Sequence, residues 1–316
     1  MYPSHKEAAM ITLDQQKIFV GMGGWDLPPF HQYFYPPKPK KGFRKLEFYS
    51  QFFDSVEINV TFYNTALTAD HARRWLRDVA ANKNFMFTVK LYRGFTHTLD
   101  ATNEDVRSVR RLLEPIAEAG KLGGIVAQFP QSFVSTSERR QYLRQFSRVF
   151  YPHRVFVEVR HASWNDPFFF NLLEENNLHL VNVDLPPLWN SMPLTSLAWN
   201  DVAYFRMMGR NVKTWNHPEL GERYDYYYNE KELDDLLQRM KKLREQSNTL
   251  FVVFHNDPEA NSLVNGFQLR HLVRKPPVLV PRGMIRAFPE LKGISSSVNV
   301  LHPLFAEVEI PVSGLR

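Results

Sequence analysis

Seven apolar segments of this chain end in charged or amide side chains, an arrangement that could support chemistry if the segments lie side by side. These side chains are Glu57, Asn59, Lys90, Gln128, Glu158, Arg160, Asp184, Arg206, His255 and Asn256. Carboxylates can act as general acid and general base if their surroundings separate their pKa values, and lysine and arginine can hold a carboxylate or phosphate. We therefore predict Glu57, Glu158 and Asp184 as catalytic residues of a hydrolase or isomerase type. The others would bind a small anionic or polyhydroxylated molecule.

Further candidate ligand-binding residues follow these segments in the sequence. They are Trp25, Tyr63, His97, His161, Trp164 and Arg223. We expect the aromatic side chains to form pocket walls, because binding pockets are mostly apolar with a few polar groups. Arg210 lies with Arg223 in a long segment rich in Trp, Tyr and Arg, and it could add another cation.

Segment 154–164 shows the pattern most clearly. Its valines alternate with Phe156, Glu158 and Arg160, and successive side chains of a strand point to opposite faces. Glu158 and Arg160 therefore share a face that needs water or charged partners, whereas the valines need apolar cover. In parallel α/β folds, catalytic residues lie at this end of a strand. The alternative interpretation is a buried structural ion pair, and three acids against three bases could form a purely neutralising network.

Eight segments have the composition of buried strands, and most are followed by a helical pattern. The expected strands are 18–21, 55–59, 85–90, 124–130, 154–160, 178–184, 202–206 and 250–256. The expected helices are 43–53, 68–81, 103–119, 135–149 with Ser135 and Glu138 at capping spacing, one opened by Asp166, 229–243 and 260–273. Pro186, Pro187 and Pro193 argue against a long helix after the sixth strand.

This alternation over about 270 residues predicts a TIM-like (β/α)8 barrel within 18–274. An open doubly wound sheet is the alternative. Residues 1–17 are expected to be an N-terminal extension, and 275–316 an irregular tail packed on or beside the barrel.

Composition excludes several classes of protein. The chain has 316 residues and no cysteine, so disulfides, thiolate nucleophiles and cysteine metal sites are ruled out. It has neither a signal-peptide pattern nor an apolar run of membrane-spanning length, and we expect a cytoplasmic protein. The net charge of +6 suits an anionic ligand. Because that charge is spread along the chain, a nucleic-acid partner is neither indicated nor excluded.

We predict no cofactor, and a divalent metal ion is the alternative. Glu57, Glu158, Asp184, His161 and His255 are suitable ligand types, but they lack a metal-binding spacing and lie near cationic residues. Glycine fingerprints for nucleotides and a GxSxG elbow are absent. Two other functions stay open: a metal-assisted phosphoesterase or nucleic-acid-processing enzyme, and a non-catalytic small-molecule sensor or interaction module.

A series of motifs, in order along the chain, resembles the YecE-like family, also called domain of unknown function 72. The motifs are GMGGW (21–25), EIN (57–59), TFY (61–63), TH (96–97), QFP (128–130), EVRH (158–161), SW (163–164), VD (183–184), RYDY (223–226) and EL (232–233). The match runs from 18 to about 272. It implies a TIM-barrel-like fold and does not supply a reaction.

Four positions depart from the pattern expected of that family. Met22 and Gly23 stand where Thr and Ser are usual, Met208 stands where His is common, and His255 stands where Asn is common. If the family residues contact the ligand, the resemblance implies a variant ligand or a lost activity in this member.

Overall fold

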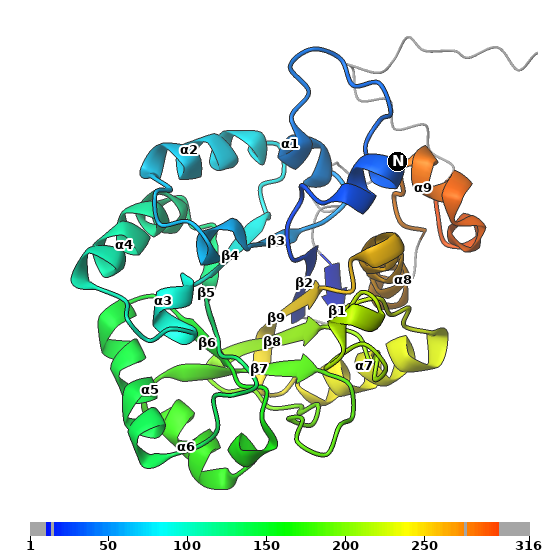
Figure 1. The fold of residues 1–316 in the computed structure, drawn as a ribbon. Coiled ribbons are helices and arrows are strands. Elements are labelled where there is room, and N and C mark those ends of the chain that lie inside the picture. The colour runs from blue at the N-terminus through cyan, green and yellow to red at the C-terminus, as the bar shows by residue number, and fades with distance from the viewer. Residues whose placement is uncertain (1–10, 14–15, 275–276, 297–316) are drawn as a thin grey trace, which may run out of the picture.

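The computed structural model describes residues 11–13, 16–274 and 277–296, and its strands close into a barrel (Figure 1). The strands are β1 (Ile11–Leu13), β2 (Gln16–Met22), β3 (Ser55–Ile58), β4 (Met86–Lys90), β5 (Leu122–Gln128), β6 (Val155–Glu158), β7 (Leu178–Asp184), β8 (Asp201–Met207) and β9 (Ser247–Phe254). Strands β2 to β9 are parallel neighbours in chain order, and β9 pairs with β2 to close the ring. The predicted TIM-like α/β barrel is therefore confirmed, as are its eight strands.

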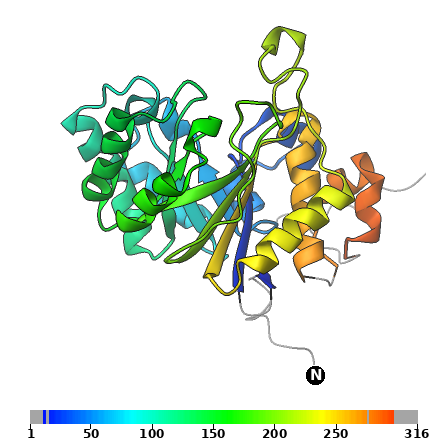
Figure 2. The ribbon, with the colours of Figure 1, turned by 90° about the horizontal axis from the view of Figure 1, so that it is seen from below.

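Helices surround the barrel, and Figures 1 and 2 show them outside the strands. They are α1 (Lys45–Tyr49), α2 (Ala69–Asp78), α3 (Arg93–Thr96), α4 (Asn103–Glu118), α5 (Ser137–Phe150), α6 (Pro167–Glu175), α7 (Glu230–Lys242), α8 (Asn261–Arg274) and α9 (Arg282–Ala287). Further helical elements of the π or 3-10 type are η1 (Phe30–Phe34), η2 (Val60–Phe62), η3 (Ala162–Trp164), η4 (Pro218–Leu220), η5 (Pro258–Ala260) and η6 (Pro289–Gly293). No described helix is long and apolar enough to cross a lipid bilayer.

The local sequence explains where most of the helices begin or end. Asp166 caps α6, and Asn229 and Glu232 form a capping box at α7, as their spacing predicts. The start of α5 was predicted wrongly: Thr136 is its N-cap, and its hydroxyl accepts from the backbone N–H of Arg139. The described segment 185–200 between β7 and β8 has no helix, as its prolines predict.

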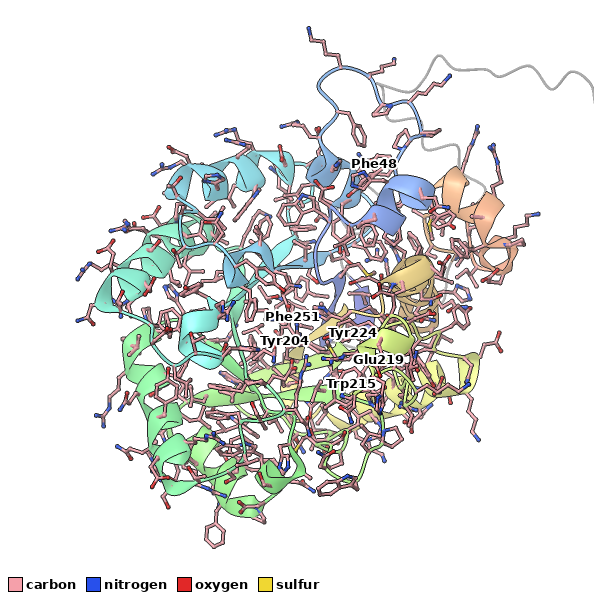
Figure 3. All side chains as sticks on the ribbon, in the orientation of Figure 1. Phe48, Tyr204, Trp215, Glu219, Tyr224 and Phe251 are labelled. Atoms are coloured by element: carbon pink, nitrogen blue, oxygen red, sulfur yellow. The ribbon has the colours of Figure 1, made fainter. Side chains whose placement is uncertain are left out.

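Aromatic side chains fill the interior of the barrel. Phe251 stacks on Phe19 and Tyr204 with centroids 5.1 and 5.7 Å apart, and Phe156 lies 4.7 Å from Tyr204. Figure 3 shows Tyr204 and Phe251 near the centre of the ring of helices. A Cβ on Gly123 would lie 2.6 Å from Phe251, so glycine makes room for that ring. These rings form a packed floor, and a site must lie at the strand ends above them.

The described part of the expected tail contains two helical elements, α9 and η6, where the sequence suggested irregular structure. Phe288 packs on Tyr33 at 5.3 Å, and Met284 and Leu291 are fully buried. A helix of six residues is too short to produce a clear hydrophobic period, so no helical pattern was expected. Likewise, β1 lies in the expected N-terminal extension. The predictions for 1–10, 14–15, 275–276 and 297–316 lie outside the described residues.

Candidate functional site

Charged side chains from four strands or strand ends meet at the carboxyl end of the barrel. Arg206 donates from Nη2 to Glu57 Oε1 at 2.8 Å and from Nη1 to Glu158 Oε2. Arg160 donates from Nε to Glu158 Oε1 at 2.8 Å, and Arg206 Nε donates to His255 Nε2 at 3.1 Å. We call Glu57, Glu158, Arg160, Arg206 and His255 the inner cluster.

The aromatic floor supports the inner cluster through Tyr204. The Tyr204 hydroxyl donates to Glu57 Oε2 at 2.9 Å and lies 2.8 Å from the Thr88 hydroxyl. Glu57 and Glu158 are both fully buried, and each of their four carboxylate oxygens has a partner. Such complete pairing is what makes two buried carboxylates tolerable.

Electrostatics fix the protonation states in the inner cluster. Burial alone would raise the pKa of both glutamates, but Arg206 outweighs it together with His255 and Lys90 at Glu57 and with Arg160 at Glu158. The pKa of Glu57 is strongly lowered, and that of Glu158 is lowered to about 2. Burial and Arg206 lower the pKa of His255 to about 4, so its imidazole is neutral at pH 7. The two glutamates are therefore ionised and have no proton to donate as general acids near neutral pH.

Lys90, at the end of β4, has a different environment. Its Nζ lies 4.0 Å above the centroid of the Phe62 ring, and no carboxylate of the described residues lies within ion-pairing distance. Burial and the nearby Arg206 lower its pKa to about 7 despite the attraction of Glu57. His97 packs its edge on the same Phe62 ring at 4.8 Å, and burial and Lys90 lower its pKa to about 4. A half-neutral amine and a neutral imidazole thus contact the same aromatic ring at pH 7.

The segment after β8 adds a rim of arginine and aromatic side chains. The guanidinium carbons of Arg160 and Arg223 lie 5.8 and 5.5 Å from the Trp215 ring. Tyr224 packs edge-on to Trp215 at 5.7 Å, and it lies close enough to Arg160 for that guanidinium to affect its pKa. Burial would raise the pKa of Tyr224, but Arg160 lowers it overall. Figure 2 shows this yellow-green segment projecting beyond the barrel.

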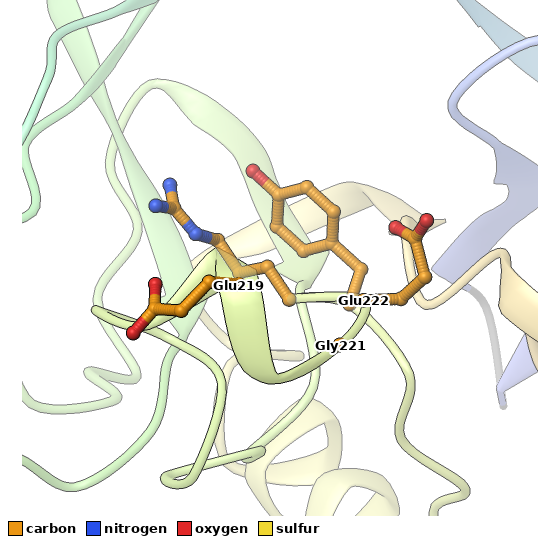
Figure 4. A pocket seen from close by; sticks show the side chains of 5 residues that line it. Glu219, Gly221 and Glu222 are labelled. Atoms are coloured by element: carbon orange, nitrogen blue, oxygen red, sulfur yellow. The ribbon is translucent and has the colours of Figure 1, made fainter.

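A pocket of about 490 Å3 lies in this projecting segment (Figure 4). Its lining residues are Glu219, Gly221, Glu222, Arg223 and Tyr224. No member of the inner cluster lines it, and two of its lining side chains are acidic. It is therefore a hollow of the rim rather than the mouth of the barrel.

The sequence pattern described as "Protein of unknown function DUF72" matches residues 19–285, which include the whole barrel from Phe19 onward. This chain belongs to the DUF72 family. The resemblance predicted from the motifs is thereby confirmed.

Known DUF72 proteins are similar to this chain over most of their length. The UPF0759 protein YunF of Bacillus subtilis is 29% identical over 274 residues, which are 81% of this chain and 94% of YunF. A DUF72 family protein from Thermotoga maritima has 30% identity and a TM-score of 0.72, covering 81% of this chain and 98% of that chain. One from Enterococcus faecalis has 24% identity and a TM-score of 0.71, covering 81% and 95%. The names of these proteins state no reaction.

In this DUF72 barrel, two predicted site residues, Asp184 and Asn256, lie outside the mouth because of the register of the strands. Residues paired across parallel strands share a face, and inward-facing Phe156 pairs with His179, while Arg206 pairs with Val183. The alternate residue Asp184 therefore faces the outer helices, where Arg210 Nε donates to its Oδ2 at 2.9 Å. The expectation that Asp184 joins the catalytic carboxylates is corrected by this register.

Asn256, also expected at the mouth, alternates with the inward His255 and faces outward in the same way. Its Nδ2 donates to the Tyr226 carbonyl and to Asn265 Oδ1 of α8, at 2.8 Å each. It thereby ties the rim segment to the barrel wall, a structural contact that alternation along a strand could have suggested.

Three aromatic candidates occupy different environments. Trp164 is fully buried, stacks on Phe133 and donates from Nε1 to the Phe133 carbonyl at 2.6 Å. It is therefore a core residue and not the expected pocket wall. Tyr63 is 76% exposed, and half-buried Trp25 packs edge-on to Trp75 of α2.

The remaining candidates lie around the mouth. Asn59 donates from Nδ2 to the Gly23 carbonyl at 2.7 Å, whereas its buried Oδ1 has no partner among the described residues. Gln128 donates to the Phe129 carbonyl at 2.7 Å. His161 accepts from the Ser163 backbone N–H, so its Nδ1 caps the η3 turn. In the described residues, no three histidine or carboxylate side chains are grouped as a metal ion requires.

Gly23 and His255, two of the four residues that depart from the family pattern, contact each other. A Cβ on Gly23 would overlap the His255 ring, so the imidazole fits because residue 23 is glycine. The sequence marks both positions separately, and their contact arises only in the fold. Phe62, Trp215 and Tyr224 were not predicted as site residues, although their segments are visibly rich in aromatic side chains.

Proposed function

We propose that this DUF72 protein is an enzyme that binds a small polar anion at the carboxyl-terminal mouth of the barrel and transforms it by acid–base chemistry. The observation that supports this is a charge imbalance. The carboxylates of Glu57 and Glu158 balance Arg160 and Arg206, and Lys90, whose pKa is about 7, adds a further positive charge whenever it is protonated. The third acid, Asp184, which could balance that charge, is paired outside the mouth. A bound anion would restore neutrality in a setting where unpaired buried charge is costly.

The donors available to that anion can be assigned by their existing partners. Arg206 already uses Nε, Nη1 and Nη2 for the inner cluster and is 1% exposed. Arg160 uses Nε for Glu158 and contacts Tyr224, which leaves further guanidinium N–H groups. Arg160 and Lys90 are therefore the proposed anion-binding side chains, and Arg206 is the residue that positions Arg160 through Glu158.

The acid–base roles follow from the protonation states. Glu57 and Glu158 are ionised and fully hydrogen-bonded, so they serve in this proposal to hold the arginines. Lys90 has a pKa of about 7, which is close to the value at which a group is most effective as a general base near neutral pH. Neutral His97 contacts the same Phe62 ring as Lys90, and in this proposal it relays a proton.

Native mass spectrometry, read beside elemental analysis, tests the proposal on protein purified without chelator. We expect a small anionic molecule to co-purify with the wild-type protein. Arg160→Gln should weaken its retention at least tenfold, because it removes the charged donors at the mouth. Arg140→Gln is the matched control, since Arg140 pairs with Asp166 outside the barrel.

Two results would overturn this function. One is wild-type protein that carries no anion and is not stabilised by any member of a panel of small carboxylates and phosphates. The other is a stoichiometric divalent metal with equal anion retention in both variants, which would favour the metal-assisted alternative.

A further inference from the structure

We infer that Lys90 forms an imine with the carbonyl group of a small oxo acid, so that the mouth of the barrel takes carbonyl-bearing carboxylates. This inference deepens the proposed function and rests on it for the carboxylate. It assigns Lys90 a covalent role and names the substrate class.

The surroundings of Lys90 differ from those of two other lysines that have polar partners, Lys45 and Lys121. Lys45 pairs with Asp26 at 2.6 Å, and Lys121 donates to three backbone carbonyls, two of them at 3.0 Å. Lys90 Nζ instead faces the Phe62 ring, and it has no hydrogen bond or ion pair to another described residue. An amine held this way keeps its lone pair available once it loses its proton.

The position of Lys90 is fixed and reachable. Its carbonyl accepts from Thr61 Oγ1 at 2.5 Å, and its strand pairs on both sides with β3 and β5. The residue retains some exposed surface, so a small molecule can contact it. A rigid strand end is a better support for a reacting group than a mobile loop.

Two fixed cations favour the neutral amine. Arg206 and Arg160 both act on Lys90 through space, and Arg206 has the larger effect of the two. Desolvation and a neighbouring cation are the two conditions that activate lysine for imine formation. The resulting pKa of about 7 supports this reading: about half of the amine is neutral at pH 7, against about one in 2,500 for an ordinary lysine.

The covalent step balances without another reagent. The neutral Nζ attacks the carbonyl carbon and forms the C–N bond, giving a carbinolamine. The carbonyl oxygen then leaves as water, carrying both protons that the amine loses. Neutral His97, which contacts the same Phe62 ring as Lys90, is assigned the transfer of a proton between nitrogen and oxygen.

The carboxylate of the substrate is assigned to Arg160. That guanidinium is held by Glu158 on one side and Trp215 on the other, which fixes the direction of its remaining N–H groups. A small oxo acid carries a carboxylate and a carbonyl group close together. It therefore fits a site in which Arg160 binds the carboxylate and the amine of Lys90 attacks the carbonyl carbon. A neutral aldehyde has no carboxylate to accept from the remaining N–H groups of Arg160.

Reductive trapping tests the inference directly. The full-length protein is incubated at pH 7 with glyoxylate or pyruvate and sodium cyanoborohydride, and the adduct is measured by intact mass and located by peptide mapping. We expect one adduct per chain, on Lys90, formed at least 100-fold faster than on an exposed lysine such as Lys38. This ratio should shrink as the pH rises toward 10 and ordinary lysines lose their protons.

Lysine variants provide the controls. Lys90→Arg should abolish the adduct, whereas Lys121→Arg should leave it unchanged. Because the adduct is mapped in the wild-type protein, the result does not depend on how a variant folds. The inference is overturned if Lys90 is unlabelled, or if Lys38 is labelled equally fast at pH 7.

Two further probes separate this inference from the proposed function. Oxalate carries carboxylates but no ketone or aldehyde; if it binds in an Arg160-dependent manner while glyoxylate gives no adduct, anion binding stands and the imine is overturned. If glycolaldehyde labels Lys90 as fast as glyoxylate does, the amine is reactive but the carboxylate specificity is overturned. If glyoxylate labels Lys90 faster than glycolaldehyde does, and Arg160→Gln removes that difference, both the imine and the carboxylate specificity are supported.

Discussion

Arg206→Met should strongly destabilise the protein. Arg206 is 1% exposed and neutralises two fully buried carboxylates, Glu57 and Glu158. The pKa of Glu158 lies at about 2 instead of 4.5, which corresponds to about 3 kcal/mol because one pKa unit is worth about 1.4 kcal/mol. Removing one partner of a buried ion pair typically costs about 3–5 kcal/mol. We expect the free energy of unfolding to fall by about that amount at pH 7.

The pH dependence should change sign in the same variant. In the wild-type protein, the depressed pKa of Glu158 gives a stabilisation that is complete above 4.5 and is lost as the pH falls through about 2. In Arg206→Met, burial is no longer outweighed at Glu57, whose pKa should rise above its ordinary value. Acidification then neutralises a buried charge, so stability should increase as the pH falls from about 7 to about 5.

Urea unfolding followed by circular dichroism between pH 4 and pH 8 measures both effects. Arg140→Met is the matched control, because its partly exposed pair with Asp166 should be worth less than about 1 kcal/mol. Adding Glu57→Gln to Arg206→Met should recover part of the loss. The reasoning fails if Arg206→Met destabilises no more than Arg140→Met, or if its stability follows the wild-type dependence on pH.

Two other predictions concern packing around the site. Gly23→Ala should cost about 1–3 kcal/mol, because its Cβ would overlap the His255 ring, and adding His255→Asn should remove most of that cost in a double-mutant cycle of thermal unfolding. Additive losses would show that the two positions are independent. Trp164→Ala should cost about 3–5 kcal/mol while leaving anion affinity unchanged, because Trp164 is enclosed by the Phe133 ring and the core. A tenfold loss of anion affinity without a loss of stability would show instead that Trp164 forms part of the pocket wall.

The sequence was most informative where one segment carries its own signal. Alternation in segment 154–160 and the capping residue Asp166 identified a strand and a helix start that the structure contains. Such patterns are local, since a strand repeats every two residues and a cap acts within one turn. The short helix α9 and the three-residue β1 are too short to show a repeated pattern, and both were missed.

The sequence by itself determined the alternation of strands and helices and the polar character of the strand ends, because both follow from residue type and spacing along one segment. Only the tertiary structure decided which face those polar residues occupy. Register placed Glu57 inside the barrel and Asp184 outside it, although both follow the same alternating pattern. The charge balance of the mouth likewise depends on Glu57 and Arg206, which are 149 residues apart and meet at 2.8 Å only when the sheet closes. Burial and neighbouring charge then set the protonation of Lys90, and neither can be read from the order of residues alone.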